Sequence, residues 1–158
     1  KVWTSGRDKG LAQIEHSLVP AAVAGLGPRA QIVDVAVPES LPPVDADPAL
    51  LERVVANLVD NAVAHSPPDA PVRVEAGEVG DRVLVRVVDR GPGIPAAERE
   101  RVFQPFQRTG DSTRSRGAGV GLGLAVARGF TRAMGGDLVV DDTPGGGTTM
   151  VLDLAVHR

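Results

Sequence analysis

Between residues 48 and 65, apolar side chains recur every three or four positions, which is the period of an amphipathic helix. Asp47 precedes this stretch as an N-cap residue, Pro48 suits the first helical turn, and the Ser-Pro-Pro sequence at 66–68 ends it. The pattern therefore predicts one long helix with a broad apolar face. The predicted face consists of Leu51, Val54, Val55, Leu58, Val59 and Ala62.

In five other stretches, apolar and polar residues alternate, and this period of two is typical of half-buried strands. We expect these strands at 31–37, 72–78, 82–89, 137–142 and 148–156. Gly80 and Asp81 lie between the second and the third of them, where they predict the turn of a hairpin.

Helical spacing of apolar residues predicts three further helices, at 10–26, 96–106 and 120–134. In the last helix we expect the buried face to comprise Leu122, Val126, Phe130 and Ala133. Together, the predicted elements indicate an α+β two-layer sandwich, in which helices cover one face of a mixed, mostly antiparallel sheet.

The composition fits a single globular domain and excludes several classes of function. With 158 residues, of which 42% are hydrophobic, the chain can bury a full core. Its net charge of -3 argues against a dedicated nucleic-acid binder, and its lack of cysteine excludes disulfides and thiolate zinc sites. No apolar run approaches the length of a membrane span.

Two glycine-rich stretches on either side of a polar segment point to a nucleotide. The first follows the predicted strand that ends at Asp89, and the second, at 117–124, opens a predicted helix. Free amides at the start of a helix favour an anion, so the segment at about 107–119 is expected to be a lid over phosphates. The glycine spacing differs from the dinucleotide-binding fingerprint, and no phosphate-binding loop with Gly-Lys-Ser/Thr is present.

Three polar side chains are candidates for ligand contacts, each with a simpler alternative. Asp89 shares the phase of the apolar row in strand 82–89, and a carboxylate on that side needs a partner. The partner could be a ligand amino group or the amides of the following turn. Asn57 and Asn61 lie one helical turn apart, where their oxygens could ligate a hard cation or could belong to a solvated face.

Five short motifs in this chain resemble those of the sensor histidine kinases and occur in that family's order. They are an N box at 57–62, a glycine box at 89–94, an F box at 103–106, a second glycine box at 119–124 and a Gly-Thr pair at 147–148. The resemblance implies the ATP-binding catalytic domain of these kinases, with the Bergerat (GHKL) fold, in residues 31–158. Residues 1–30 are then a lead-in and a first helix. The phrases at 106–111, 127–136 and 142–152 resemble the potassium-responsive members of the family.

This resemblance also implies a set of site residues, with ATP and Mg²⁺ as the cofactors. Asn61 would ligate Mg²⁺ with support from Asn57, Arg108 would approach the γ-phosphate, and Asp89 would accept the amino group of adenine. Asn61 and Arg108 are thereby the predicted catalytic residues. The other predicted nucleotide contacts are His65, Gly91, Gly93, Ile94, Gly119, Gly121, Leu122, Gly123, Leu124 and Thr148.

In one position the chain departs from the family pattern. Ala64 stands where many family members carry Lys or Arg against a phosphate, three residues after Asn61. A protonated His65 could take over that role, or His65 could be an exposed residue at the end of a helix. Because Ala64 offers no cation to a phosphate, an alternative function stays open, in which the domain is a degenerate nucleotide sensor that binds ATP without transferring its phosphoryl group.

The partners implied by the resemblance are a histidine-containing dimerisation domain of the same receptor and a cognate response regulator. We expect a monomeric cytoplasmic piece of a membrane receptor, which contacts neither nucleic acid nor membrane. His16 lacks the residues that surround a phosphoacceptor histidine, so this piece is not expected to autophosphorylate alone. A gyrase-like ATPase or an anti-sigma serine kinase is the other alternative, although Glu52 projects away from the two asparagines.

Overall fold

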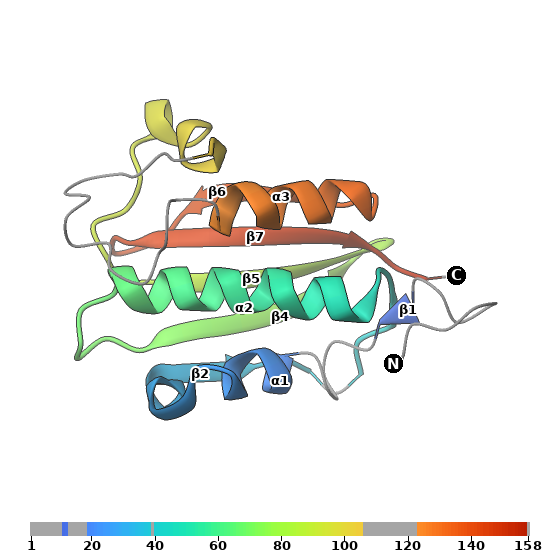
Figure 1. The fold of residues 1–158 in the computed structure, drawn as a ribbon, viewed down its shortest axis with the longest axis horizontal. Coiled ribbons are helices and arrows are strands. Elements are labelled where there is room, and N and C mark those ends of the chain that lie inside the picture. The colour runs from blue at the N-terminus through green and yellow to red at the C-terminus, as the bar shows by residue number, and fades with distance from the viewer. Residues whose placement is uncertain (1–10, 13–18, 39, 106–122, 158) are drawn as a thin grey trace.

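A five-stranded sheet in the order β2-β4-β5-β7-β6 forms one layer of the molecule (Figure 1). This computed structural model describes residues 11–12, 19–38, 40–105 and 123–157. The strands are β2 (Val33–Ala36), β4 (Val72–Val79), β5 (Arg82–Asp89), β6 (Asp137–Asp142) and β7 (Thr148–Ala155). β2 runs parallel to β4, and the other three pairs are antiparallel. The prediction of a mixed, mostly antiparallel sheet is confirmed.

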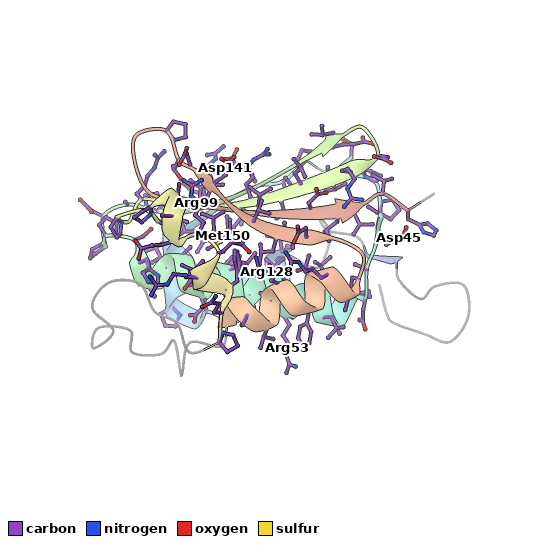
Figure 2. The ribbon with its side chains drawn as sticks, turned by 90° about the horizontal axis from the view of Figure 1, so that it is seen from above. Asp45, Arg53, Arg99, Arg128, Asp141 and Met150 are labelled. Carbon is purple, nitrogen blue, oxygen red and sulfur yellow. The ribbon has the colours of Figure 1, made fainter. Side chains whose placement is uncertain are left out.

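The second layer consists of helices on one face of that sheet, as Figure 2 shows from above. The helices are α1 (Val19–Ala24), α2 (Pro48–His65) and α3 (Gly123–Ala133). Short 3-10 turns are η2 (Gly27–Ile32), η3 (Ala96–Glu98) and η4 (Arg101–Phe103). In Figure 1, α2 lies in front of the sheet between α3 and α1. The predicted two-layer α+β sandwich is therefore the architecture of the chain.

The long helix α2 has the predicted bounds because local chemistry defines both of its ends. Asp47 Oδ1 accepts a hydrogen bond of 2.9 Å from the Ala49 amide, and the Ser66 amide donates to the Ala62 carbonyl at 3.0 Å. All six residues of the predicted apolar face are buried. On the opposite layer, β5 buries every second residue, ending with Asp89. Aliphatic side chains from α2 and the sheet thus form the core.

The N-terminal helix prediction for residues 10–26 is wrong in its first part. Leu11–Ala12 forms a short strand, β1, which pairs antiparallel with β3 (Val44–Asp45). The helix α1 covers Val19–Ala24, with Pro20 as its second residue, and 13–18 lie outside the described residues. A pairing partner more than thirty positions away overrides the local helical spacing here.

Two other predicted elements are shorter than expected. β2 covers only Val33–Ala36, because η2 occupies the preceding residues up to Ile32. In place of a helix at 96–106, the chain makes the two single turns η3 and η4. These turns are too short to sustain a ladder of α-helical hydrogen bonds.

Within the described residues, the predicted face of α3 is correct only at Phe130, which is half-buried against the core. Ala127 and Thr131 are the buried residues of this helix, whereas Val126 is 38% exposed and Ala133 is exposed. The Thr131 hydroxyl donates to the Ala127 carbonyl at 2.7 Å, so a polar side chain can face the core. Leu122 lies outside the described part of the chain.

Candidate nucleotide-binding site

Three segments that are distant in the sequence meet at one end of the sheet. They are the C-terminal end of α2, the residues that follow β5, and the connection from β6 to β7. A Cβ atom on Gly91 would collide with the His65 carbonyl oxygen, and one on Gly147 would collide with the Asp89 carbonyl oxygen. Both positions therefore need glycine, because the main chains touch there.

Asp89 is the centre of this site, and it is only 4% exposed. Its Oδ1 atom accepts hydrogen bonds from the Gly91 amide at 2.8 Å and from the Thr148 amide at 3.2 Å. No group in the described parts of the chain donates to Oδ2. Asp89 thus closes the turn after β5, as one alternative proposed, and still has a buried carboxylate oxygen available to a ligand.

Burial raises the pKa of the Asp89 carboxyl above its ordinary value of 3.8. Hydrogen bonds from the amides of Gly91 and Thr148 and the charge of His65 act in the opposite direction. The net increase means that the protein environment only partly compensates the buried charge. A ligand group that donates a hydrogen bond to Oδ2 would supply further compensation.

The two asparagines of α2 have different surroundings. Asn57 Nδ2 donates a hydrogen bond of 3.5 Å to the carbonyl of Gly123, the first residue of α3. The half-buried side chain of Asn61 has no hydrogen bond to any other described residue, while its backbone carbonyl accepts one of 2.8 Å from His65 Nδ1. Asn57 is therefore engaged with the start of α3, and the amide of Asn61 is available to a ligand.

Asn61 fits a magnesium ion that is held mainly by a nucleotide. Within the described residues, no group of three or more His, Cys, Asp or Glu side chains could hold a metal. Mg²⁺ commonly binds proteins through one or two oxygens and takes its other ligands from phosphates and water. A single amide oxygen beside a phosphate site is compatible with that arrangement.

The structure brings several other predicted contacts to this end of the molecule. Gly93 has a φ of +79°, which suits glycine, and Thr148 is 6% exposed next to Asp89. Ile94 and Leu124 are half-buried against the core. Ala64 and His65 are exposed at the end of α2, and Gly123 begins α3. Arg108, Gly119, Gly121 and Leu122 lie outside the described residues.

Sequence reasoning missed three polar residues at this site. The Ser66 hydroxyl accepts a hydrogen bond of 3.2 Å from the Arg90 amide, and the Arg90 guanidinium donates to the Pro144 carbonyl at 2.7 Å. Arg99 forms an ion pair with Asp142 at the end of β6. No local pattern predicts these contacts, because each partner lies at least 24 positions away along the chain.

A buried strand-end carboxylate beside glycine turns, with asparagines on the neighbouring helix, defines an ATP-binding domain of the GHKL class. The chain belongs to the family of histidine kinase-, DNA gyrase B-, and HSP90-like ATPases, which matches residues 46–158. Its curated relatives identify the branch of that family. This chain is similar to the sensor protein KdpD of Mycobacterium tuberculosis, with 57% identity over 110 residues.

That alignment covers 70% of this chain and 12% of the mycobacterial protein. The KdpD of Rathayibacter rathayi is 49% identical over 132 residues, which are 84% of this chain and 15% of that protein. The chain therefore spans less than a sixth of the length of these relatives. Within that length, the prediction of a histidine kinase catalytic domain similar to that of KdpD is confirmed.

Solved structures agree with this assignment. The mycobacterial sensor histidine kinase MprB has a TM-score of 0.74 at 30% identity, covering 89% of this chain and 93% of that one. The ATP-binding domain of PrrB from Mycobacterium tuberculosis has a TM-score of 0.70 at 28% identity and is covered completely, by 96% of this chain. Full-length ShkA in complex with AMPPNP matches 98% of this chain and 33% of its own, with a TM-score of 0.75 at 29% identity.

In the described parts of the chain, no helix combines the length and the hydropathy that crossing a membrane requires.

Proposed function

We propose that this domain binds Mg²⁺-ATP and presents the γ-phosphoryl group to a histidine on a separate dimerisation domain of the same receptor. A response regulator would then receive the phosphoryl group from that histidine. Membership of the histidine kinase family and the 57% identity to KdpD support this proposal.

The buried Oδ2 atom of Asp89 is the observation that carries the proposal. An acceptor that is almost fully desolvated and has no donor among the described residues is costly unless a ligand supplies one. The exocyclic amino group of adenine is such a donor. Guanine would present a carbonyl oxygen at the same place, so the carboxylate would also select against GTP.

On the phosphate side, Asn61 would hold Mg²⁺ by its free amide oxygen. The bound ion would neutralise phosphate charge. Asn57 would keep the first turn of α3 in place through its bond to the Gly123 carbonyl, so that the free amides of this turn face the phosphates. The remaining predicted contacts, to Arg108, Gly119, Gly121 and Leu122, follow from the family resemblance alone.

Phosphoryl transfer requires mainly positioning and charge stabilisation from the protein. In this proposal, Asp89 fixes the base, the start of α3 orients the phosphate chain, and Arg108 approaches the γ-phosphate. Glu52, the carboxylate considered as a base in the gyrase-like alternative, is exposed on α2. This arrangement favours transfer to a supplied acceptor over activation of water, as in a gyrase-like ATPase.

The similarity to KdpD extends the proposal to the receptor as a whole. The receptor would respond to potassium or osmotic conditions and would carry this domain on the cytoplasmic side of a membrane. Its kinase would be a homodimer, while the isolated domain would be a monomer. These statements rest on the identity to KdpD over 70% of this chain.

Calorimetric titration of the wild-type chain and of Asp89→Asn with Mg²⁺-ATP and Mg²⁺-GTP tests the site. We expect binding of ATP, weaker binding of GTP, and loss of ATP binding in the variant, because the asparagine oxygen would accept from the Gly91 and Thr148 amides and its NH₂ group would then face the amino group of adenine. Wild-type affinity in Asp89→Asn would contradict the adenine assignment. Transfer of ³²P from ATP to an added histidine-containing dimerisation domain then tests the reaction.

A second candidate function is a nucleotide sensor that binds ATP without transfer. Ala64 favours it, because this exposed position at the end of α2 offers no cation to a phosphate. Binding of ATP without any transfer to the added acceptor domain would support the sensor and exclude the kinase.

A further inference from the structure

The connection from β6 to β7, residues 143–147, has an unusual backbone. Its last three residues are consecutive glycines with φ angles of +86°, +102° and +112°. Glycine loses more conformational freedom on folding than any other residue, so such a loop is costly to hold in one conformation. The residue that follows it, Thr148, nevertheless donates its amide to Asp89. Other contacts must therefore order this loop.

Some of these contacts lie within the loop. The Gly146 amide donates to the Thr143 carbonyl at 2.9 Å, with Pro144 and Gly145 in the central positions of the turn. The hydroxyls of Thr143 and Thr149 are 2.7 Å apart and buried. These bonds shape the loop, but none of them joins it to residues 89–94.

Arg90 provides the first contact between the loop and the segment after β5. Its guanidinium donates to the Pro144 carbonyl at 2.7 Å, and its own amide is held by the Ser66 hydroxyl at 3.2 Å. Arg90, which directly follows Asp89, thereby joins three segments: the end of α2, the segment after β5 and the loop 143–147. A charged donor to a backbone carbonyl is among the stronger hydrogen bonds of proteins.

Arg99 provides a second contact, on the other side of the same segment. Its side chain is 26% exposed, forms an ion pair with Asp142 immediately before the loop, and donates from Nε to the Ile94 carbonyl at 3.4 Å. Figure 2 shows Arg99 and Asp141 at the same end of the molecule. The side chain of Asp142 is 85% exposed, so the ion pair alone contributes little to stability. Its effect is to hold the residue before the loop next to Arg99, which also bonds the Ile94 carbonyl.

We propose that Arg90 and Arg99 are positioning residues that hold the loop 143–147 against residues 89–94 and so fix the adenine side of the nucleotide site. Neither guanidinium is assigned a contact with nucleotide. Both act through main-chain carbonyls and Asp142, and before the ligand arrives they hold the loop beside the Thr148 amide and the Asp89 carboxylate, which the register of β5 and β7 pairs. This inference rests on the proposed function, in which Asp89 binds adenine.

Such preorganisation has a consequence that separates it from a phosphate contact. Removing either arginine would free the loop, and the ligand would then have to order it on binding. That cost is the same for adenosine, ADP and Mg²⁺-ATP, because all three occupy the adenine side. Direct contact of an arginine with a phosphate would instead weaken Mg²⁺-ATP much more than adenosine.

The variants Arg90→Ala, Arg99→Ala and the double variant test the proposal, with Arg82→Ala as the matched control. Arg82 forms an ion pair of 2.7 Å with Asp153 at the other end of β5, and its side chain is 35% exposed. Affinities for adenosine, ADP and Mg²⁺-ATP are measured by calorimetry and by NMR titration of the ¹⁵N-labelled chain. Arg90→Lys and Arg99→Lys keep the charge and serve as rescue variants if an alanine variant does not fold.

We expect each alanine variant to weaken all three ligands by a similar factor, about fivefold, with a larger loss in the double variant. Arg82→Ala should bind as the wild type does, and the lysine variants should recover part of the affinity. Wild-type affinity in the double variant, or a loss confined to Mg²⁺-ATP, would overturn the proposal.

Asp89→Asn separates this inference from the proposed function. If Asp89→Asn loses binding while the double arginine variant keeps it, the positioning role of Arg90 and Arg99 is refuted and the adenine site stands. If the wild type binds none of the three ligands, both proposals fail together.

Discussion

The backbone amide of Thr148 donates a hydrogen bond of 3.2 Å to Oδ1 of Asp89, fifty-nine residues earlier in the chain. The two residues are also direct partners in the register between β5 and β7. The position of the Asp89 carboxylate is therefore a property of the sheet, and changes to that register are expected to affect the proposed binding of ATP.

Gly147 is the position at which this arrangement tolerates substitution least. In Gly147→Ala the added Cβ would collide with the Asp89 carbonyl at a φ of +112°, which side chains rarely adopt. We expect a loss of about 3 kcal/mol in the free energy of unfolding, measured by urea denaturation. Gly77→Ala in β4 is the control, because its Cβ would have no neighbour within 4 Å. Equal stability of the two variants would contradict the close approach.

Asp89→Asn is expected to stabilise the domain at neutral pH, although we also expect it to lose ATP binding. Because burial raises the folded-state pKa of Asp89 above 3.8, the folded protein holds this proton more tightly than the unfolded chain. The stability that Asp89 contributes is fully present below 3.8 and is lost as the pH rises through the folded-state pKa. Asparagine keeps an oxygen for both amides and never carries the charge.

Urea denaturation of both proteins at neutral pH and at a pH below 3.8 measures this effect. We expect the variant to be more stable at neutral pH and the difference to diminish in acid. Lower stability of the variant at neutral pH would show that the neighbours of Asp89 fully stabilise its charge.

Arg128 is expected to matter more for stability than its neighbour on α3, Arg132. Its guanidinium lies 4.0 Å from the Phe103 ring centroid and 3.2 Å from both carboxylate oxygens of Glu100, and its side chain is 14% exposed. We expect Arg128→Ala to lose about 1–2 kcal/mol in the free energy of unfolding.

Arg132→Ala is the matched control for that experiment. Arg132 forms an ion pair of 3.0 Å with Asp137, but its side chain is 54% exposed, so we expect a loss below about 0.5 kcal/mol. Thermal denaturation of the two variants under the same conditions makes the comparison. A loss in Arg132→Ala as large as that in Arg128→Ala would refute the special role of the Phe103 contact.

Ala64→Arg is expected to strengthen binding of Mg²⁺-ATP. A cation at this exposed position near the end of α2 would approach the phosphates, and we expect an affinity about fivefold higher at low salt. The gain should decrease as salt is added and should be absent for adenosine. Calorimetry with both ligands tests this, and Ala64→Gln, which is uncharged, is the control. An equal gain in affinity for adenosine would show that the substitution affects binding of the adenine base and not of the phosphates.

Much of this fold can be predicted from the sequence. α2 has the predicted bounds because its apolar period, the Asp47 cap and the terminal Ser66 act within a few residues of one another. β5 was predicted with equal accuracy, since its alternation is local and a Gly80 turn precedes it. The five motifs indicated the family in the same way, as short phrases in a fixed order.

Long-range partners explain why other elements could not be predicted. β1 exists only because β3 pairs with it, and α3 buries Ala127 and Thr131 because of the surface on which it packs. The same is true of Arg90 and Arg99, whose side chains bond residues 54 and 43 positions away. Arg90 lies in the glycine box at 89–94, but that motif does not predict its partner, and Arg99 belongs to none of the five motifs.

The sequence by itself thus determined the helices and strands with a strong local period and the positions of the glycines, and it singled out Asp89 as the candidate nucleotide carboxylate. Only the tertiary structure decided which main chains touch at Gly91 and Gly147, and which arginines hold the loop before Thr148. The physical reason is the range of the interactions. Periodicity and capping depend on near neighbours, whereas contacts between distant segments form only when the sheet register has brought them together.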